Sequence, residues 1–199
     1  MLNERIMEAV SEELPIEFED FSEEIIVRAR IQTDFRNVRF SGCKFIGCDF
    51  GRAGFTAVKF TSCSFTDCDF SDSYWKDSAV EDCRLKKCRF MNSVFKSFDI
   101  VGGEYEETDF LKTSWTGCKI SGSKMENTFM SEARLKKFSL SDVEFINVDF
   151  FKTPLSGVDL SDCSVSGLMV SDSFSELKGA SMNVEQAAEV ARMMGIIIV

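Results

Sequence analysis

The segments "FSGCKFIGCDF" (residues 40–50) and "FTSCSFTDCDF" (residues 60–70) have the same arrangement, twenty residues apart. Within each segment, a phenylalanine recurs every five residues. Extending this step from Phe35 to Val170 gives 28 positions, and every one of them is a large apolar residue. Because hydrophobic residues make up 44% of the chain, so long an uninterrupted series is not a product of chance.

A period of five fits neither regular secondary structure. A helix repeats its face every 3.6 residues and a strand every 2 residues. A backbone that returns a side chain to the interior every five residues must therefore turn a corner once per repeat. The sequence predicts a solenoid in which the remaining, mostly polar, positions face outward.

The residue two positions before each apolar centre is usually small. All eight cysteines occupy this position: Cys43, Cys48, Cys63, Cys68, Cys83, Cys88, Cys118 and Cys163. Their regular placement raises four possibilities, namely metal ligands, a disulfide framework, a redox centre or small core residues.

The individual repeat units resemble those of the pentapeptide-repeat family. The units that carry the resemblance are CDF (48–50), CDF (68–70), TDF (108–110), VDF (148–150) and VDL (158–160). The resemblance implies an all-β fold, a right-handed quadrilateral β-helix with four repeats per coil. Residues 31–175 would form about seven coils, preceded by an N-terminal helical cap and lead-in (1–30) and followed by a C-terminal dimerisation helix and short strand (176–199).

Four repeats per coil would place the cysteines in interior columns, such as Cys43, Cys63 and Cys83. There they would act as small hydrophobic side chains that fill the corners of a narrow core. A zinc site normally uses shorter paired spacings and a tetrahedral arrangement, so no metal and no cofactor is expected. Stacked strands lie about 5 Å apart, within the range of a disulfide, so oxidation remains an open alternative.

Both ends of the chain differ from the repeat. Residues 2–14 are predicted to form an amphipathic helix with Leu2, Ile6, Val10 and Leu14 in one stripe, closed by Pro15. This helix would cover the first coil, and binding a partner is the alternative. Near the C-terminus, Asn183 is the expected N-cap, Gln186 completes a capping box and Gly195 ends the helix.

The C-terminal tail is unusually apolar. The "IIIV" segment (196–199) is expected to form a terminal strand, which a second copy of the chain would cover. We therefore predict a homodimer through the C-terminal module. The residues expected at its interface are Val184, Ala187, Ala188, Ala191, Met194, Ile196, Ile197, Ile198 and Val199.

This tail resembles the C-terminal module of the quinolone-resistance (Qnr-like) pentapeptide proteins, in which a helix and strand build a tail-to-tail dimer. The residues that match are Gln186, Ala187, Arg192, Gly195 and Ile196. The resemblance implies a rod that imitates duplex DNA and occupies a bacterial type II topoisomerase, DNA gyrase or topoisomerase IV. The unbroken repeat leaves no room for projecting loops between residues 35 and 170, so any contact would use the rod itself.

The net charge of −10 is unevenly distributed. Residues 1–30 contain nine acidic and three basic residues, whereas residues 31–175 contain 21 and 18. The C-terminal coils are locally acidic, since residues 138–175 contain only one base, Lys152. The acidic surface expected to bind the topoisomerase consists of Asp142, Glu144, Asp149, Asp159, Asp162 and Asp172.

Other functions are less well supported. The chain has no histidine and no phosphate-binding glycine loop, so an enzyme is not expected. It has no strongly basic face for direct nucleic-acid binding. No signal peptide or membrane span is predicted, which favours a cytoplasmic protein. The main alternative is a pentapeptide-repeat scaffold that binds a different protein partner.

Overall fold

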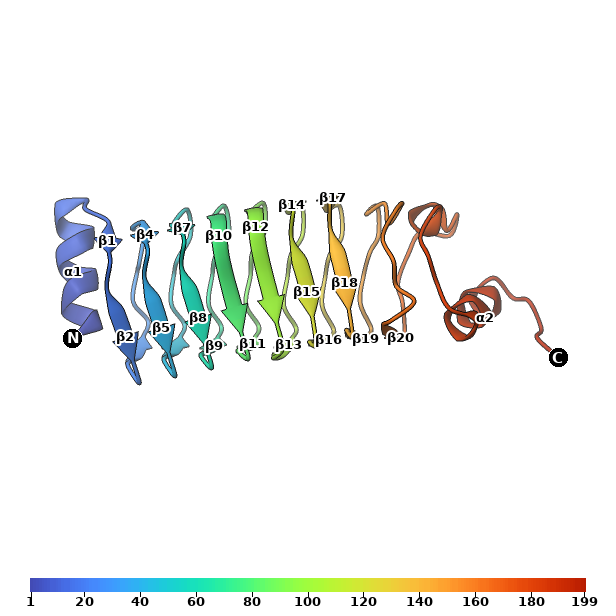
Figure 1. The fold of residues 1–199 in the computed structure, drawn as a ribbon, viewed down its shortest axis with the longest axis horizontal. Coiled ribbons are helices and arrows are strands. Elements are labelled where there is room, and N and C mark those ends of the chain that lie inside the picture. Colours follow the sequence, from blue (N-terminus) through green and yellow to red (C-terminus); the bar gives the residue numbers. More distant parts are fainter.

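The computed structural model describes residues 1–199 as a parallel β-solenoid of about eight turns. The turns stack into a straight rod with a short helix at each end (Figure 1). Helix α1 (Leu2–Glu12) lies across the N-terminal end, and helix α2 (Val184–Met193) lies beyond the last turn. A single turn of 3-10 helix, η1 (Ser175–Leu177), precedes α2. No helix is long and apolar enough to cross a membrane.

Each turn has four faces, which we number in chain order. Face 1 contains β1 (Ile16–Glu17), β4 (Phe35–Arg36), β7 (Gly54–Thr56), the first part of β10 (Tyr74–Glu81), the first part of β12 (Val94–Val101), β14 (Ser114–Thr116) and β17 (Arg134–Lys136). Face 2 contains β2 (Asp20–Ser22), β5 (Arg39–Ser41), β8 (Lys59–Thr61), the ends of β10 and β12, β15 (Lys119–Ser121) and β18 (Ser139–Ser141).

Face 3 is the second sheet. It contains β3 (Ile25–Val27), β6 (Lys44–Ile46), β9 (Ser64–Thr66), β11 (Arg84–Lys86), β13 (Glu104–Glu106), β16 (Lys124–Glu126), β19 (Glu144–Ile146) and β20 (Ser164–Ser166). Face 4 has no extended strands. Single parallel bridges hold it together, and they connect Arg30, Asp49, Asp69, Arg89, Asp109, Phe129, Asp149 and Met169 in succession.

The corners explain why the period is five. A residue with positive φ occurs at nearly every corner, for example Asn37 (φ 53°), Asp67 (φ 53°) and Lys87 (φ 56°). This left-handed conformation is unfavourable for residues other than glycine. The corner amides are nevertheless well bonded, since the N–H of Asp67 donates to the carbonyl of Lys86 in the next turn at 2.9 Å. Such bonds between turns offset the conformational cost.

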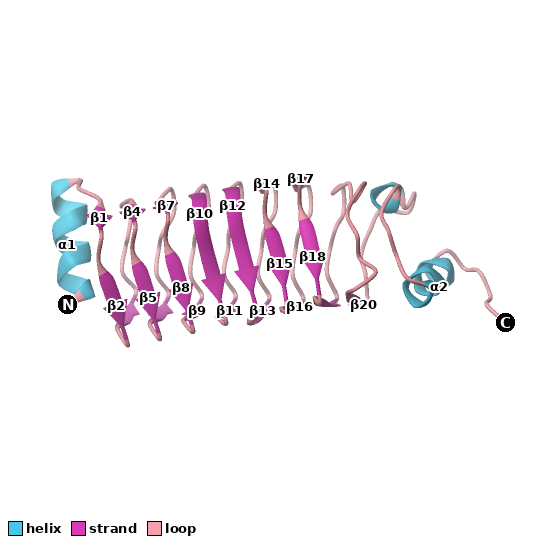
Figure 2. Cartoon of the chain, in the orientation of Figure 1, coloured by secondary structure: helices cyan, strands magenta, loops and turns pink.

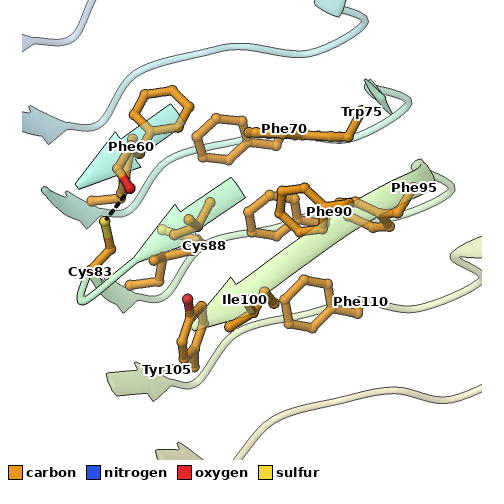
Figure 3. Close-up of a cluster of buried hydrophobic side chains, with 14 of the residues drawn as sticks. Phe60, Phe70, Trp75, Cys83, Cys88, Phe90, Phe95, Ile100, Tyr105 and Phe110 are labelled. Carbon is orange, nitrogen blue, oxygen red and sulfur yellow. Dashed lines mark hydrogen bonds between the residues drawn. The ribbon is translucent and has the colours of Figure 1, made fainter. Parts of the chain in front are cut away.

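The core is a set of stacked aromatic columns. The rings of Phe50, Phe70 and Phe90 follow one another at centroid distances of 4.6 and 4.7 Å, with interplanar angles of 5° and 4°. Figure 3 shows this interior, where Phe70 and Phe90 lie beside Trp75 and Phe95. The apolar positions predicted from the five-residue step are therefore confirmed as the inward-facing residues.

The solenoid begins earlier than the sequence predicted. Strands β1, β2 and β3 pair with the following turn, with Ile16 opposite Phe35, Phe21 opposite Phe40 and Ile26 opposite Phe45. Residues 16–31 thus form a further turn instead of a lead-in, which makes about eight turns and not seven. The buried residues Ile16, Phe21, Ile26 and Ile31 follow the same step of five. The next step, from Ile31 to Phe35, is only four residues long. A search in strict phase from Phe35 could not detect this turn.

Helix α1 buries a slightly different stripe from the one predicted. Leu2, Ile6 and Ala9 are buried, whereas Val10 is 36% exposed and Leu14 is 51% exposed. The helix ends at Glu12 because Glu13 adopts a left-handed conformation (φ 55°), so Leu14 leaves the helix direction. Residues 2, 6 and 9 lie on one side of a helix, and this side covers the first turn (Figure 2).

The cysteines are core residues. All eight are free and buried, and burial raises the pKa of the Cys118 and Cys163 thiols. Cys83 differs, because hydrogen bonding from the side chain and the backbone of Cys63, whose N–H donates to the Cys83 Sγ at 3.2 Å, lowers its pKa. The thiols donate to backbone carbonyls, as Cys83 does to the carbonyl of Phe60 at 3.6 Å (Figure 3). The structure has no group of three or more side chains placed to hold a metal.

The small-residue rule has three large exceptions, the buried residues Phe98, Phe138 and Leu168. The ring of Phe98 lies 5.0 Å from Phe95 and 5.2 Å from Trp75. The next such position in the chain is Gly103, where an added Cβ would lie 2.1 Å from the carbonyl oxygen of Cys83. Nearby, the Tyr105 hydroxyl is buried without a hydrogen-bond partner, and burial raises its pKa.

We predict that replacing Cys63 with serine destabilises the protein by less than about 1 kcal/mol. Ser78, at the equivalent position, donates to the carbonyls of Lys76 (2.8 Å) and Phe55 (3.2 Å). A hydroxyl at position 63 would have matching acceptors on Thr61 and Phe40. Urea unfolding should separate this change from Phe65→Ala, a control expected to cost about 3–5 kcal/mol. An equal loss for both, or stoichiometric zinc in the purified protein, would contradict the assignment.

Candidate interaction surfaces

Three of the predicted acidic residues lie together. Asp142 and Asp162 occupy equivalent corners between faces 2 and 3 in successive turns, and Glu144 follows on face 3. They line one shallow groove with Lys124 and several serines. We call Asp142, Glu144 and Asp162 the acidic corner. Its carboxylates are exposed, so it can attract cations on a partner.

The other three predicted acidic residues point elsewhere. Asp149 lies on face 4, Asp159 on face 2 and Asp172 at the corner after face 4. Asp149 accepts hydrogen bonds from the Phe151 amide (2.7 Å) and the Ser131 hydroxyl (2.8 Å). Asp159 accepts from the Ser161 amide at 2.9 Å, and its hydrogen bonds with Ser161 lower its pKa. The six residues therefore surround the C-terminal turns and do not form one surface.

Charge pairing distinguishes these turns from the rest of the rod. In the middle turns, basic side chains form ion pairs with acidic side chains of the neighbouring turn. Lys86 pairs with Glu106 at 2.8 Å, and Arg89 pairs with Asp69 at 2.8 Å. None of the six acidic residues has a basic nitrogen within 4 Å. The negative potential of the C-terminal turns is therefore not cancelled internally, which makes it available to a partner.

The C-terminal cap is attached by buried polar side chains. Asn183 and Gln186 form the predicted capping box at the start of α2. The Gln186 amide also donates to the carbonyls of Leu160 (2.7 Å) and Cys163 (2.6 Å) on the last turn. Glu176 is also buried, and its carboxylate accepts from the Lys152 amide (2.9 Å) and the Ser171 hydroxyl (2.7 Å). Burial opposes its ionisation, but these hydrogen bonds hold its pKa below the ordinary value.

The predicted dimer residues are largely exposed in the single chain. Val184 is 86% exposed and Ile197 is 87% exposed, while Ala188 and Ala191 are half-buried. The expected terminal strand is absent, since residues 196–199 pair with no other strand. The chain offers these residues no sheet edge, and α2 separates them from the solenoid (Figure 1). The tail therefore leaves a group of apolar side chains uncovered.

A second exposed apolar group was not predicted from the sequence. Phe129, Phe151 and Met169 lie on face 4 of the C-terminal turns and are 43%, 40% and 42% exposed. Each occupies a position next to an inward-facing centre, where the repeat normally has a polar residue. The presence of apolar residues at these normally polar positions is the sequence feature that could have predicted the exposed group.

Comparisons with known proteins agree with the fold. The family model for a pentapeptide repeat region matches residues 31–90 and 58–135, and the model for pentapeptide repeats in eight copies matches residues 130–167. A search of curated protein sequences finds no match.

Several solved structures are similar. QnrB1, described as a plasmid-mediated fluoroquinolone resistance protein, is 16% identical, covers 90% of this chain and 100% of its own, and has a TM-score of 0.41. HetL from the cyanobacterium Nostoc, described as involved in heterocyst differentiation regulation, is 11% identical over 89% of this chain and 95% of its own, with a TM-score of 0.34. Rfr23 from the cyanobacterium Cyanothece is 7% identical over 91% and 99%, with a TM-score of 0.28.

We predict that Gln186→Ala loosens α2 from the solenoid. The substitution removes the amide group that donates to the carbonyls of Leu160 and Cys163. We expect this loss to lower the stability of the cap by about 1–3 kcal/mol. Hydrogen exchange should show faster exchange of the α2 amides, with the amides of face 3 unchanged. Glu185→Ala, at an exposed position of the same helix, is the matched control. Unchanged protection of α2 in the Gln186 variant would show that this side chain does not hold the cap.

Proposed function

Since the chain belongs to the pentapeptide-repeat family, we propose that it presents its solenoid surface to a protein partner, and that this partner is a bacterial type II topoisomerase. The observation that carries the proposal is the acidity of the C-terminal turns, whose carboxylates have no internal ion pairs. A basic DNA-binding groove is a natural complement to such a surface.

A dimer would strengthen this complementarity. The exposed apolar tail would join two rods end to end at their C-terminal caps and so gather the acidic turns near a two-fold axis. Eight turns at about 4.8 Å give a rod of about 38 Å. Two rods would span about 77 Å, comparable with roughly 23 base pairs at 3.4 Å each.

Symmetry favours an enzyme with a two-fold axis. A symmetric dimer can use the same patch twice against a two-fold partner, so each favourable contact counts double. DNA gyrase and topoisomerase IV are enzymes of this kind. In this proposal, occupying the DNA-binding groove modulates the enzyme or protects it from quinolone-type drugs. The short corners mean that contacts would come from the solenoid surface and not from projecting loops.

A scaffold that binds another protein is the second candidate. The exposed phenylalanines of face 4 favour it, because a DNA mimic gains nothing from exposed aromatic side chains. Apolar side chains surrounded by polar ones are typical of protein-binding surfaces. Both candidates are binding functions and neither requires catalysis.

We predict that Ile196→Asp combined with Ile197→Asp converts a dimer to a monomer. Charges introduced into an apolar interface would remain buried and unpaired. Sedimentation at micromolar concentration measures the change. Met7→Asp, at an exposed apolar position of the opposite end, should leave the dimer intact. A wild-type protein that sediments as a monomer under these conditions contradicts the tail-to-tail dimer.

We predict that Asp142→Asn combined with Asp162→Asn weakens binding to gyrase about fivefold at low salt, if each exposed pair contributes about 0.5 kcal/mol. The control, Glu12→Gln with Glu13→Gln, removes the same charge from the distal helix and should change little. Binding to immobilised gyrase is the measurement, with supercoiling assays in the presence and absence of a fluoroquinolone.

Two outcomes would count against the topoisomerase proposal. Equal losses in the acidic-corner variant and the distal control would mean that binding depends on net charge alone. No binding to gyrase or topoisomerase IV at low salt would favour the scaffold function instead.

A further inference from the structure

Face 4 changes character along the rod. In its N-terminal half, the outward positions are polar or small, as in Asp49, Gly51, Asp69 and Ser71, except for the half-buried Met91. In its C-terminal half, large apolar residues take over, and Phe129, Phe151 and Met169 are all exposed. Leu111 is half-buried on the same face, one turn before Phe129. We call Asp109, Phe129, Asp149, Phe151 and Met169 the mixed stripe.

The stripe alternates in chemistry from turn to turn. The consecutive bridges of face 4 place Asp109, Phe129, Asp149 and Met169 above one another along the rod. Parallel strands lie about 4.8 Å apart, so the two carboxylates are about 10 Å apart with an aromatic ring between them. Neither carboxylate has a basic nitrogen within 4 Å, whereas Asp69 on the same face is paired with Arg89 at 2.8 Å.

The ring of Phe151 already accepts one cation. The ammonium group of Lys152 lies 4.9 Å from the centre of this ring. Lys152 of the same chain thus already covers the ring of Phe151. The carboxylates of Asp109 and Asp149 have no cationic group beside them. A ligand that completes the stripe must therefore bring its own cations, spaced to match these two carboxylates.

The spacing selects one kind of ligand. An α-helix rises 1.5 Å per residue, so side chains at i, i+3, i+7 and i+10 lie at about 0, 4.5, 10.5 and 15 Å on one face. The four bridged residues of the stripe, Asp109, Phe129, Asp149 and Met169, lie at about 0, 4.8, 9.6 and 14.4 Å. A strand laid along the rod would repeat its face every 6.6 Å or so and would fall out of step after one turn.

We propose that the mixed stripe binds an amphipathic helix of a protein partner that lies along the rod axis. Basic residues at i and i+7 would face Asp109 and Asp149, and apolar residues at i+3 and i+10 would pack on Phe129 and Met169. This surface lies on a different face from the acidic corner. The inference goes beyond the proposed function and does not depend on a topoisomerase being the partner.

A designed peptide tests the proposal. The probe is an alanine-rich, fluorescently labelled helix with arginine at positions i and i+7 and leucine at i+3 and i+10. A second peptide of the same composition has the arginines and leucines on opposite faces. Fluorescence anisotropy of each peptide is measured against the full-length protein at low salt, and we expect the first peptide to bind at least tenfold more tightly.

Asparagine variants separate charge from structure. The side chains of Asp109 and Asp149 each accept a hydrogen bond from the amide two residues on, at 2.8 and 2.7 Å. Asn keeps one acceptor oxygen for this amide and removes the charge. The Ser131 hydroxyl, which donates to the other oxygen of Asp149 at 2.8 Å, can rotate to accept from the Asn amide group instead. We expect Asp109→Asn with Asp149→Asn to weaken peptide binding about fivefold, on the scale of two exposed ion pairs. Phe129→Ser should weaken it further.

Asp49→Asn is the matched control. Asp49 lies on the same face and accepts the equivalent bond from Gly51 at 2.8 Å, but it is paired with Arg30 at 3.9 Å and has no exposed apolar neighbours. Its replacement should leave peptide binding unchanged. The proposal is overturned if the two peptides bind equally, if neither binds at millimolar concentration, or if Asp49→Asn weakens binding as much as the stripe variants do.

Discussion

The structure depends on backbone hydrogen bonds between successive turns, in which residues twenty apart face each other. Each turn lies directly on the previous one, as in the pairing of Phe40 with Phe60. The paired strands are parallel, so the chain must complete a full circuit before it can pair again. Four corners per circuit then place a residue in the left-handed conformation about every five residues. The aromatic columns follow from the same stacking, since equivalent inward positions recur above one another.

This arrangement separates stability from recognition. Inward side chains are constrained by the column above and below, as the Phe50, Phe70 and Phe90 stack shows. Outward side chains contribute little to the stacking, because the bonds between turns use the backbone. The outer surface is therefore free to vary from turn to turn. The paired charges of the middle turns, such as Lys86 with Glu106, and the unpaired ones of the C-terminal turns are two results of that freedom.

The sequence predicts the inward half of the molecule well and the outward half poorly. A period of five identifies every core position from Phe35 onward, because each must satisfy the same packing. It missed the turn that starts at Ile16, because one corner is a residue shorter there. Outward neighbours have no such periodic constraint. The spacing of Asp142, Asp149 and Asp159 in the sequence did not indicate that they lie on three different parts of the surface, or that Asp149 bonds to Phe151 and Ser131.

The two ends of the rod are closed in different ways, and this difference gives the molecule a direction. At the N-terminal end, α1 covers the first turn with Leu2, Ile6 and Ala9. At the C-terminal end, Gln186 satisfies two carbonyls of the last turn, but the apolar residues beyond α2 remain exposed. A rod whose N-terminal core is covered and whose C-terminal tail is not can associate end to end in only one sense. Because both the unpaired acids and the exposed phenylalanines lie in the C-terminal turns, any association there would bring the acidic and apolar surfaces of two copies closer together.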